Sequence, residues 1–188
     1  MRFKANTVTS LVIAPIFIFL CNVSCTKNTP NPTETGVLPP AGTSSDTNAV
    51  AAKDAKLAGT FKQANDGVEA SLTITGLQPN TEHGMHVHAV GECSGPDFKT
   101  SGDHFNPQTK NHGAPGDSNA HLGDLGNITA DGSGNFSGTI KIKNATRDGA
   151  NGILRRSLIV HQNADDLKSQ PSGDSGDRIA CVVINSVD

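Results

Sequence analysis

The sequence predicts an all-β protein with an antiparallel sandwich or barrel fold, and three observations support this class. Short segments alternate between apolar and polar residues with a period of two. Glycine, proline and asparagine separate these segments at short intervals. No stretch of ten or more residues carries a convincing helical period. The length of 188 residues allows one main domain with an additional tail.

The clearest predicted strand covers residues 68–75. Every second residue in it is apolar, beginning with Val68, as expected for a half-buried strand, and Gly76 ends the run. Residues 49–53 and 57–63 are weaker strand candidates upstream.

Four further strands are predicted in the second half of the chain. Residues 127–130 and 136–143 flank the turn-rich sequence DGSG, which is typical of a hairpin. The second arm carries apolar residues on one face and lysines on the other. The apolar runs 158–161 and 179–184 are short enough to be buried strands.

The N-terminus has the features of an export signal. Arg2 and Lys4 precede the apolar run 11–20, which is too short to span a bilayer. Cys21 and Cys25 follow, and we expect Cys25 to carry a lipid after cleavage because the small residue Ser24 precedes it. A bacterial lipobox favours leucine where this chain has asparagine, so a plain cleaved signal is the alternative.

An export signal at the N-terminus implies three consecutive parts in the chain. Residues 1–24 are assigned to the signal, 25–47 to a flexible Thr-, Pro- and Asn-rich tether, and 48–188 to the folded domain. The predicted location is the periplasm or the cell surface, with the lipid as the membrane anchor. In that oxidising compartment Cys93 and Cys181 are expected to form one disulfide, and buried free thiols are the alternative.

Histidines are concentrated in an irregular region and in the predicted strand that precedes it. Residues 91–123 are rich in glycine, proline and asparagine, and an irregular segment of this length needs a bound metal or a disulfide to order it. Imidazole suits zinc and copper, and a carboxylate completes a zinc set. Five of the seven histidines lie between residues 84 and 124.

Two ligand groups follow from the spacing. His86 and His88 project from the same face of a strand and can bind one ion, with His161 available to join them. Three nitrogens and one oxygen make a closed tetrahedral zinc set in composition, and they come from His104, His112, His121 and Asp124.

These residues resemble the copper/zinc superoxide dismutase family. The similarity runs from about residue 49 to residue 184, in the family's order, through HGMHVH, GDHFNP, NHGAP, HLGDLGN, IVHQNADDL and GDRIACVVI. It implies a Greek-key β-sandwich or barrel with long metal-binding and electrostatic loops. It also implies copper and zinc as cofactors and superoxide as the substrate, which is converted to oxygen and hydrogen peroxide.

The resemblance assigns roles to individual residues. Copper is expected on His86, His88, His104 and His161, and zinc on His104, His112, His121 and Asp124. His104 would bridge both metals and carry a proton during turnover. Asp165 would orient a histidine of each metal, and Arg178 would attract and orient the anion. His83 matches a structural histidine of the family.

Two departures from the animal enzymes affect what is expected. The segment between His161 and Cys181 is short, and its Lys168 is expected to contribute weakly, if at all, to steering the anion. Val182 and Asn185 stand where animal enzymes have dimer-contact glycines, so any homodimer is expected to differ from the animal type.

Composition and ligand chemistry argue against three other functional classes. The net charge of −3 provides no basic surface for nucleic acid. A zinc hydrolase needs an open coordination position, which four protein ligands do not leave. A non-enzymatic copper or zinc buffer could use the same ligands, but it has no need of an arginine that orients an anion.

Overall fold

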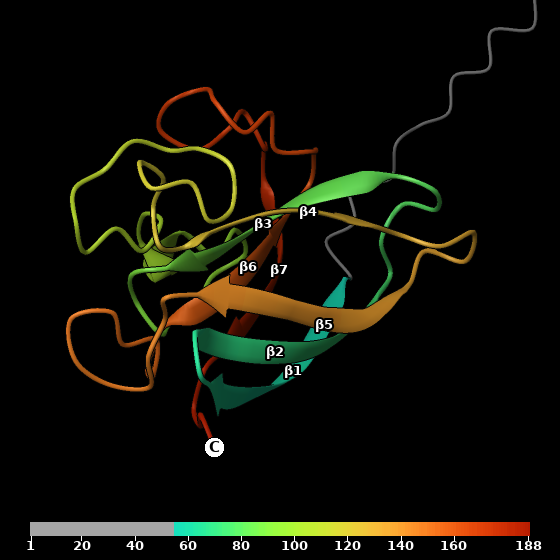
Figure 1. Cartoon of the computed structure of the whole chain (residues 1–188). Helices are drawn as coiled ribbons and strands as arrows, with labels where there is room; N and C mark the ends of the chain where they lie inside the picture. Colours follow the sequence, from blue (N-terminus) through green and yellow to red (C-terminus); the bar gives the residue numbers. More distant parts are fainter. Residues whose placement is uncertain (1–54) are drawn as a thin grey trace, which may run out of the picture. The chain divides into compact units, whose positions relative to one another are not determined.

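The computed structural model describes residues 55–188 (Figure 1). This part contains the strands β1 (Lys56–Ala64), β2 (Gly67–Thr75), β3 (Glu82–His88), β4 (Asp124–Thr129), β5 (Phe136–Lys143), β6 (Ser157–His161) and β7 (Arg178–Val183). Its only helical element is the 3-10 turn η1 (Lys99–Ser101). No helix of the described residues is long and apolar enough to cross a membrane.

The strands form two antiparallel sheets, as the sequence predicted. One sheet has the order β1-β2-β5 and the other has the order β4-β3-β6-β7. Figure 1 shows them as two layers, with the long loop that follows β3 gathered at one end. The chain changes sheet between consecutive strands more than once, so this is a Greek-key-like sandwich rather than a simple meander.

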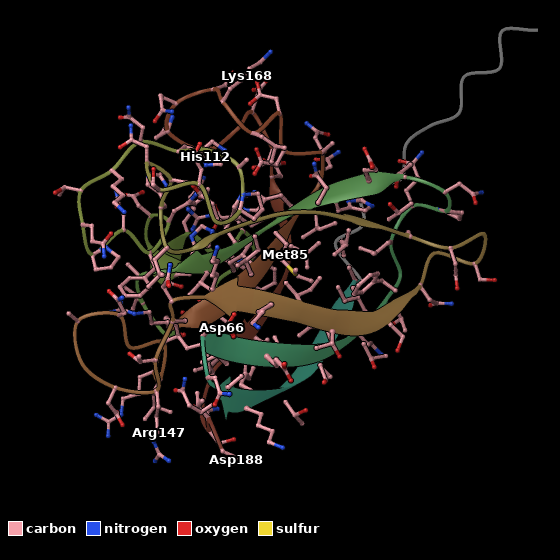
Figure 2. The ribbon with its side chains drawn as sticks, in the orientation of Figure 1. Asp66, Met85, His112, Arg147, Lys168 and Asp188 are labelled. Atoms are coloured by element: carbon pink, nitrogen blue, oxygen red, sulfur yellow. A yellow bond between two sulfur atoms is a disulfide. The ribbon has the colours of Figure 1, made fainter. Side chains whose placement is uncertain are left out.

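The hydrophobic core lies between the two sheets. In β2 the predicted alternation is realised, because the apolar side chains of the strand are buried and the polar ones between them are exposed. From the opposite sheet Met85, Leu158 and Val160 are fully buried against this face. Figure 2 shows Met85 in the interior of the molecule.

Most strand predictions agree with the structure. Residues 57–63 lie in β1, 158–161 in β6, and 179–184 overlap β7. The candidate strand 49–53 lies outside the described residues, as do the predicted signal, the tether and Cys25. The fold therefore confirms the all-β prediction for residues 55–188 and does not test the N-terminal assignments.

The predicted hairpin around DGSG is wrong. β4 pairs with β3, and β5 pairs with β2 in the other sheet. The connection 130–135 instead runs beside the connection 76–81, which also crosses between the sheets. Three backbone hydrogen bonds join the two crossings, donated by Leu77 N–H to Gly134 O at 3.0 Å, by Asn80 N–H to Asp131 O at 3.1 Å and by Ala130 N–H to Thr81 O at 2.9 Å.

The physical reason for this error is that turn residues fix a local bend but not the partner of the strand that follows. The Asp131 carboxylate accepts hydrogen bonds from the N–H groups of Ser133 and Asn135, so the turn itself is present. β5 then places Ile140 opposite Ala70, which buries its apolar face in the shared core.

The disulfide between Cys93 and Cys181 is present, as predicted. It ties the beginning of the long loop after β3 to strand β7 across 88 positions of sequence. Closing a loop of this length is valued at about 4 to 5 kcal/mol by the chain-entropy account. The disulfide thus restrains the loop that carries three of the seven histidines, His104, His112 and His121.

We expect Leu158→Ala to lower the free energy of unfolding by about 3 kcal/mol, within the range of about 2–5 kcal/mol for a buried leucine. Leu158 is fully buried in the core, whereas Val90 is 48% exposed. Urea denaturation of the variants should therefore show a small change for Val90→Ala, about 0.5 kcal/mol or less. Equal losses for the two variants would contradict this placement of the core.

Candidate metal centre

The four-stranded sheet places the histidines of the centre. β3 carries His86 and His88, both buried, and the neighbouring strand β6 ends at His161. β4, on the other side of β3, begins at Asp124, which is the register partner of His86. His104 joins β3 from the long loop through an isolated bridge to His88. Residues 75 positions apart in sequence are therefore brought together by strand pairing.

The first cluster consists of four histidines. One ring nitrogen of each lies within 4.8 Å of the others, and the members are His86, His88, His104 and His161. Hydrogen bonds to backbone carbonyls define two of the tautomers, because a carbonyl only accepts. His88 Nδ1 donates to Gly102 O at 2.8 Å and His161 Nδ1 donates to Gly176 O at 3.1 Å. In the neutral rings both Nε2 atoms then carry lone pairs, and they face each other at 3.4 Å.

The other two histidines of this cluster each present a buried nitrogen without a partner. His86 Nδ1 and His104 Nε2 are buried and have no hydrogen bond among the described residues. His86 Nε2 lies 2.9 Å from Asp165 Oδ2, so it donates there and leaves Nδ1 as an acceptor. Unpaired buried polar atoms are costly, and four converging nitrogen lone pairs are what a cation such as copper requires.

The second cluster is organised around one carboxylate oxygen. Asp124 Oδ1 lies 3.0 Å from His104 Nδ1, 3.0 Å from His112 Nδ1 and 3.2 Å from His121 Nδ1. A tetrahedral ion with bonds of about 2.0 Å separates its ligand atoms by about 3.3 Å, so these distances fit a shared zinc ion. The other oxygen, Oδ2, accepts the N–H groups of Gly113 and His121 at 3.0 Å each.

One group of possible ligand atoms that all lie within 4.8 Å of one another contains His86, His104, His112 and Asp124, with His86 in place of His121. We assign His121 to this cluster on the basis of its Nδ1 contact to the common oxygen. His86 has one nitrogen committed to Asp165 and the other turned to the first cluster, which leaves it no donor atom for a second ion.

Asp165 links the two clusters from behind. Its Oδ2 accepts from His86 Nε2 and its Oδ1 accepts from His112 Nε2, both at 2.9 Å. The side chain is fully buried, and Asn127 holds its backbone through two hydrogen bonds. This geometry orients one histidine of each cluster, which is the arrangement that the family resemblance implied for Asp165.

Burial favours the neutral form of three histidines in the first cluster, His86, His88 and His161. Desolvation lowers the pKa of His88 to about 2 and that of His161 to about 4, and it holds the pKa of His86 well below the usual value. Burial pushes the pKa of Asp124 upward, but its hydrogen bonds with His104 and Gly113 outweigh this effect and leave it lowered. Neutral imidazoles beside a carboxylate anion are the protonation states that bind metal.

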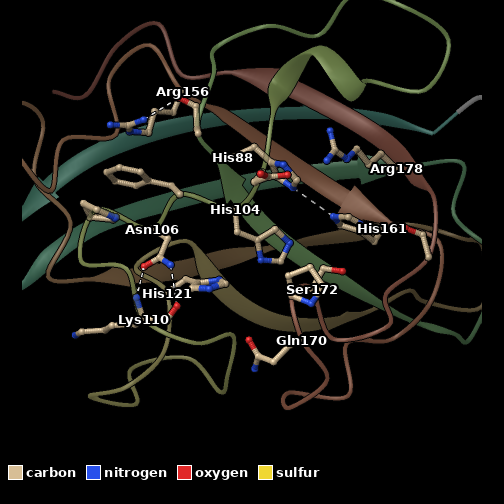
Figure 3. A pocket seen from close by; sticks show the side chains of 16 residues that line it. His88, His104, Asn106, Lys110, His121, Arg156, His161, Gln170, Ser172 and Arg178 are labelled. Atoms are coloured by element: carbon tan, nitrogen blue, oxygen red, sulfur yellow. Dashed lines mark hydrogen bonds between the residues drawn. The ribbon is translucent and has the colours of Figure 1, made fainter. Parts of the chain in front are cut away.

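A solvent-accessible cavity of about 760 Å³ opens onto the first cluster. Figure 3 shows His88, His104 and His161 on its wall, with Arg178 beside His161. Lys110 and Arg156 also line it, and their presence at the cavity was not predicted from the sequence. Lys168 does not line it, and Figure 2 shows this residue at the outer end of the 162–177 loop.

Arg156 shows why the sequence could not identify all of these residues. Its guanidinium lies 3.4 Å from the ring centroid of Phe105 and donates to Gly152 O and Ala89 O, each at 2.7 Å. These partners come from separate loops, so no local motif marks the residue. His83, by contrast, is buried and donates to the backbone carbonyl of His161 at 2.9 Å, a supporting position outside both clusters.

The fold and the site define a β-sandwich metalloprotein in which two adjoining ion sites share one histidine. A profile of the copper/zinc superoxide dismutase family matches residues 58–184. The chain belongs to the copper/zinc superoxide dismutase family. The two metals of this family suit the two sets of donor atoms, four imidazoles for copper and three imidazoles with a carboxylate for zinc.

Fungal relatives match this chain over 70% or more of its length. The chain is 42% identical to the copper-zinc superoxide dismutase of Humicola lutea over 146 residues, which cover 72% of this chain and 95% of the relative. It is 40% identical to the enzyme of Cordyceps militaris over 141 residues, which cover 70% of this chain and 91% of that relative.

Solved structures agree with the fold. A SOD-like protein from Bacillus subtilis is 30% identical, with a TM-score of 0.63 over 66% of this chain and 86% of that one. A double mutant of that protein has a TM-score of 0.64 at 29% identity, covering 70% of this chain and 96% of the mutant chain.

We expect the metal-free protein to lose stability as the pH falls from about 6.5 to about 4. His161 has a folded pKa of about 4 and His88 of about 2, whereas an unfolded histidine titrates near about 6.5. The unfolded state therefore binds more protons in this window, and each such histidine lowers the free energy of unfolding by about 1.4 kcal/mol per pH unit.

Urea denaturation at a series of pH values measures this slope. His161→Gln removes one titrating group, so the slope should become shallower by about 1.4 kcal/mol per pH unit. A free energy of unfolding that stays constant from about pH 6.5 to about pH 4 would show that these histidines are not buried in the neutral form.

Proposed function

We propose that this chain is a superoxide dismutase that protects the cell envelope, with copper held by the four-histidine cluster and zinc by the Asp124 cluster. The observation that carries the proposal is the convergence of unpaired imidazole nitrogens on a cavity lined by Arg178. The family and the fungal relatives named as copper-zinc superoxide dismutases support the reaction. When bound, copper supplies the one-electron chemistry that oxidises one superoxide to oxygen and reduces another to hydrogen peroxide.

Arg178 is placed to bind and orient the anion. It lies on the cavity wall, and no carboxylate within residues 55–188 lies within 4.0 Å of its guanidinium. Its positive charge therefore remains available to a small anionic substrate. A metal buffer would gain nothing from this arrangement, so the enzyme is favoured over the non-enzymatic alternative.

His104 is placed to handle a proton. Its Nδ1 faces Asp124 at 3.0 Å, and its Nε2 is buried in the first cluster without a hydrogen-bond partner among the described residues. Because His104 also lines the cavity, its Nε2 can take up a proton and pass it to reduced substrate held there. The Asp124 cluster holds the loop that carries His104, which is a structural task suited to zinc.

Export and anchoring complete the proposal. We place the domain outside the cytoplasm, attached through lipid at Cys25 and the tether that follows it. The disulfide between Cys93 and Cys181 supports an oxidising compartment. A homodimer, if formed, would use contacts different from those of the animal enzymes, since Val182 and Asn185 replace the glycines expected there.

We expect the full chain loaded with copper and zinc to remove superoxide, and the zinc-only protein to be inactive. Arg178→Ala should lower kcat/KM by about tenfold or more, because it removes a charge that steers the substrate. Pulse radiolysis measures this rate directly. The matched control is Lys168→Ala, which removes a cation outside the cavity and should change kcat/KM by less than about twofold.

Absence of superoxide removal at full copper occupancy would reject the dismutase and favour a copper or zinc buffer. An equal loss in the Lys168 and Arg178 variants would instead reject the assignment of the guiding cation to the cavity.

For the anchor, we expect Cys25→Ser to move the protein from the membrane fraction to the soluble exported fraction. Cys21→Ser, which alters the neighbouring cysteine of the leader, should leave it in the membrane. Fractionation of bacterial cells that incorporate a labelled fatty acid measures both location and acylation. Label retained in Cys25→Ser, or release by Cys21→Ser alone, would contradict the assignment of the lipid to Cys25.

A further inference from the structure

We propose that Ser101 is a positioning residue for Arg178 and thereby sets the affinity of the cavity for anions. This inference rests on the proposed function only in placing copper at the four-histidine cluster. Nothing in the sequence marks Ser101, which lies in the loop between Cys93 and His104. Its role follows from what its hydroxyl contacts in the folded chain.

The guanidinium of Arg178 is held by one short turn. Its Nη1 donates to Phe98 O at 2.9 Å and to Ser101 Oγ at 3.0 Å, and its Nη2 donates to Gly102 O at 2.8 Å. All three acceptors belong to η1 or its flanking residues. Ser101 provides the only side chain among them.

These acceptors fix the arginine without cancelling its charge. All are neutral oxygens, so they orient the guanidinium and leave its positive charge for the substrate. A carboxylate in the same place would hold the group equally well but would compete with the anion. Arg178 is thus held in position by groups that do not neutralise its charge, and Ser101 is one of these groups.

Ser101 is itself firmly held. Its side chain is completely buried, and its hydroxyl donates to Phe98 O at 2.7 Å while accepting from Arg178. The hydroxyl therefore bridges the arginine to the backbone carbonyl that the arginine also contacts. Removing the hydroxyl of Ser101 would leave Arg178 Nη1 with Phe98 O as its remaining acceptor, in a partly buried site where a lost hydrogen bond is costly.

The backbone of the turn provides an independent indication of function. Phe98 has φ of 51°, in the left-handed region that non-glycine residues seldom occupy, and Gly102 has φ of 74°. A non-glycine residue such as Phe98 remains in this region where the surrounding structure stabilises it. Here the two residues at the ends of the turn supply the carbonyls that receive Arg178.

The same turn also contacts the first cluster. Gly102 O accepts from His88 Nδ1 at 2.8 Å as well as from Arg178 Nη2. The guanidinium and the histidine are therefore set relative to each other through one carbonyl. A change in Arg178 orientation at Ser101 would shift the anion relative to the metal while leaving the histidines in place.

The experiment is a titration of the copper- and zinc-loaded full chain with azide, a small anion that binds Cu(II), followed by visible absorption. We expect Ser101→Ala to raise the azide Kd by about three- to tenfold, the scale of a lost hydrogen bond to a charged group. Ser101→Thr keeps the hydroxyl and should restore affinity. Ser157→Ala is the matched control, since Ser157 is equally buried and its hydroxyl donates to Val90 O at 2.8 Å, away from Arg178.

Two readouts separate positioning from general damage. In an Arg178→Ala background, Ser101→Ala should leave the azide Kd unchanged, because there is no guanidinium left to position. The dependence of kcat/KM on salt should persist in Ser101→Ala, which keeps the charge, and weaken in Arg178→Ala. Copper content should match that of the wild type.

The proposal is overturned by an azide Kd within twofold of wild type, by equal effects in both backgrounds, or by loss of copper from Ser101→Ala. If that variant does not fold, NMR of the zinc-only wild type decides, with resolved Nη signals of Arg178 expected and averaged signals contradicting a held guanidinium. Azide affinity that depends on Ser101 without any superoxide removal would reject the dismutase and keep the positioning role.

Discussion

The structure depends on the packing of seven buried ligand side chains around two ion sites, with His104 common to both sites. Burial lowers the pKa of His86, His88 and His161, and hydrogen bonds to Asp165 and to backbone carbonyls turn their lone pairs toward the first cluster. Such a group of unpaired nitrogens is unfavourable in a protein interior. Cations resolve this conflict, so the fold and its two metals stabilise each other.

Three features of the surrounding structure hold the ligands in place: strand pairing, the disulfide and the Asp165 carboxylate. Strand pairing brings β3, β4 and β6 together, which places a histidine pair, a carboxylate and a third histidine at one end of the sheet. The disulfide to β7 restrains the loop that supplies the remaining ligands. Asp165 then couples the two clusters through one histidine of each. Each of these features restrains different ligands, so the loss of one is not fully replaced by the other two.

The cationic side chains that line the cavity are held in different ways. Arg178 is held by neutral acceptors beside His161, whereas Arg156 is stacked on Phe105 and bonded to two loop carbonyls. Lys110 lines the same cavity from the metal-binding loop. The proposed function therefore assigns attraction of the anion to the cations that line the cavity rather than to Lys168 in the shortened loop. This distribution suits a substrate that is small and singly charged.

The sequence by itself predicted the strand class, the cysteine pair and the candidate ligand residues, because these depend on local alternation, on residue types with few alternative uses, and on motifs shared with a known family. Only the tertiary structure decided that β4 and β5 belong to different sheets, since alternation defines a strand's buried face but not its partner. Likewise, Ser101 and Arg156 became visible only after folding. Ser101 contacts Arg178 across 77 positions of sequence, and Arg156 contacts Ala89 across 67, and no local pattern encodes such distances.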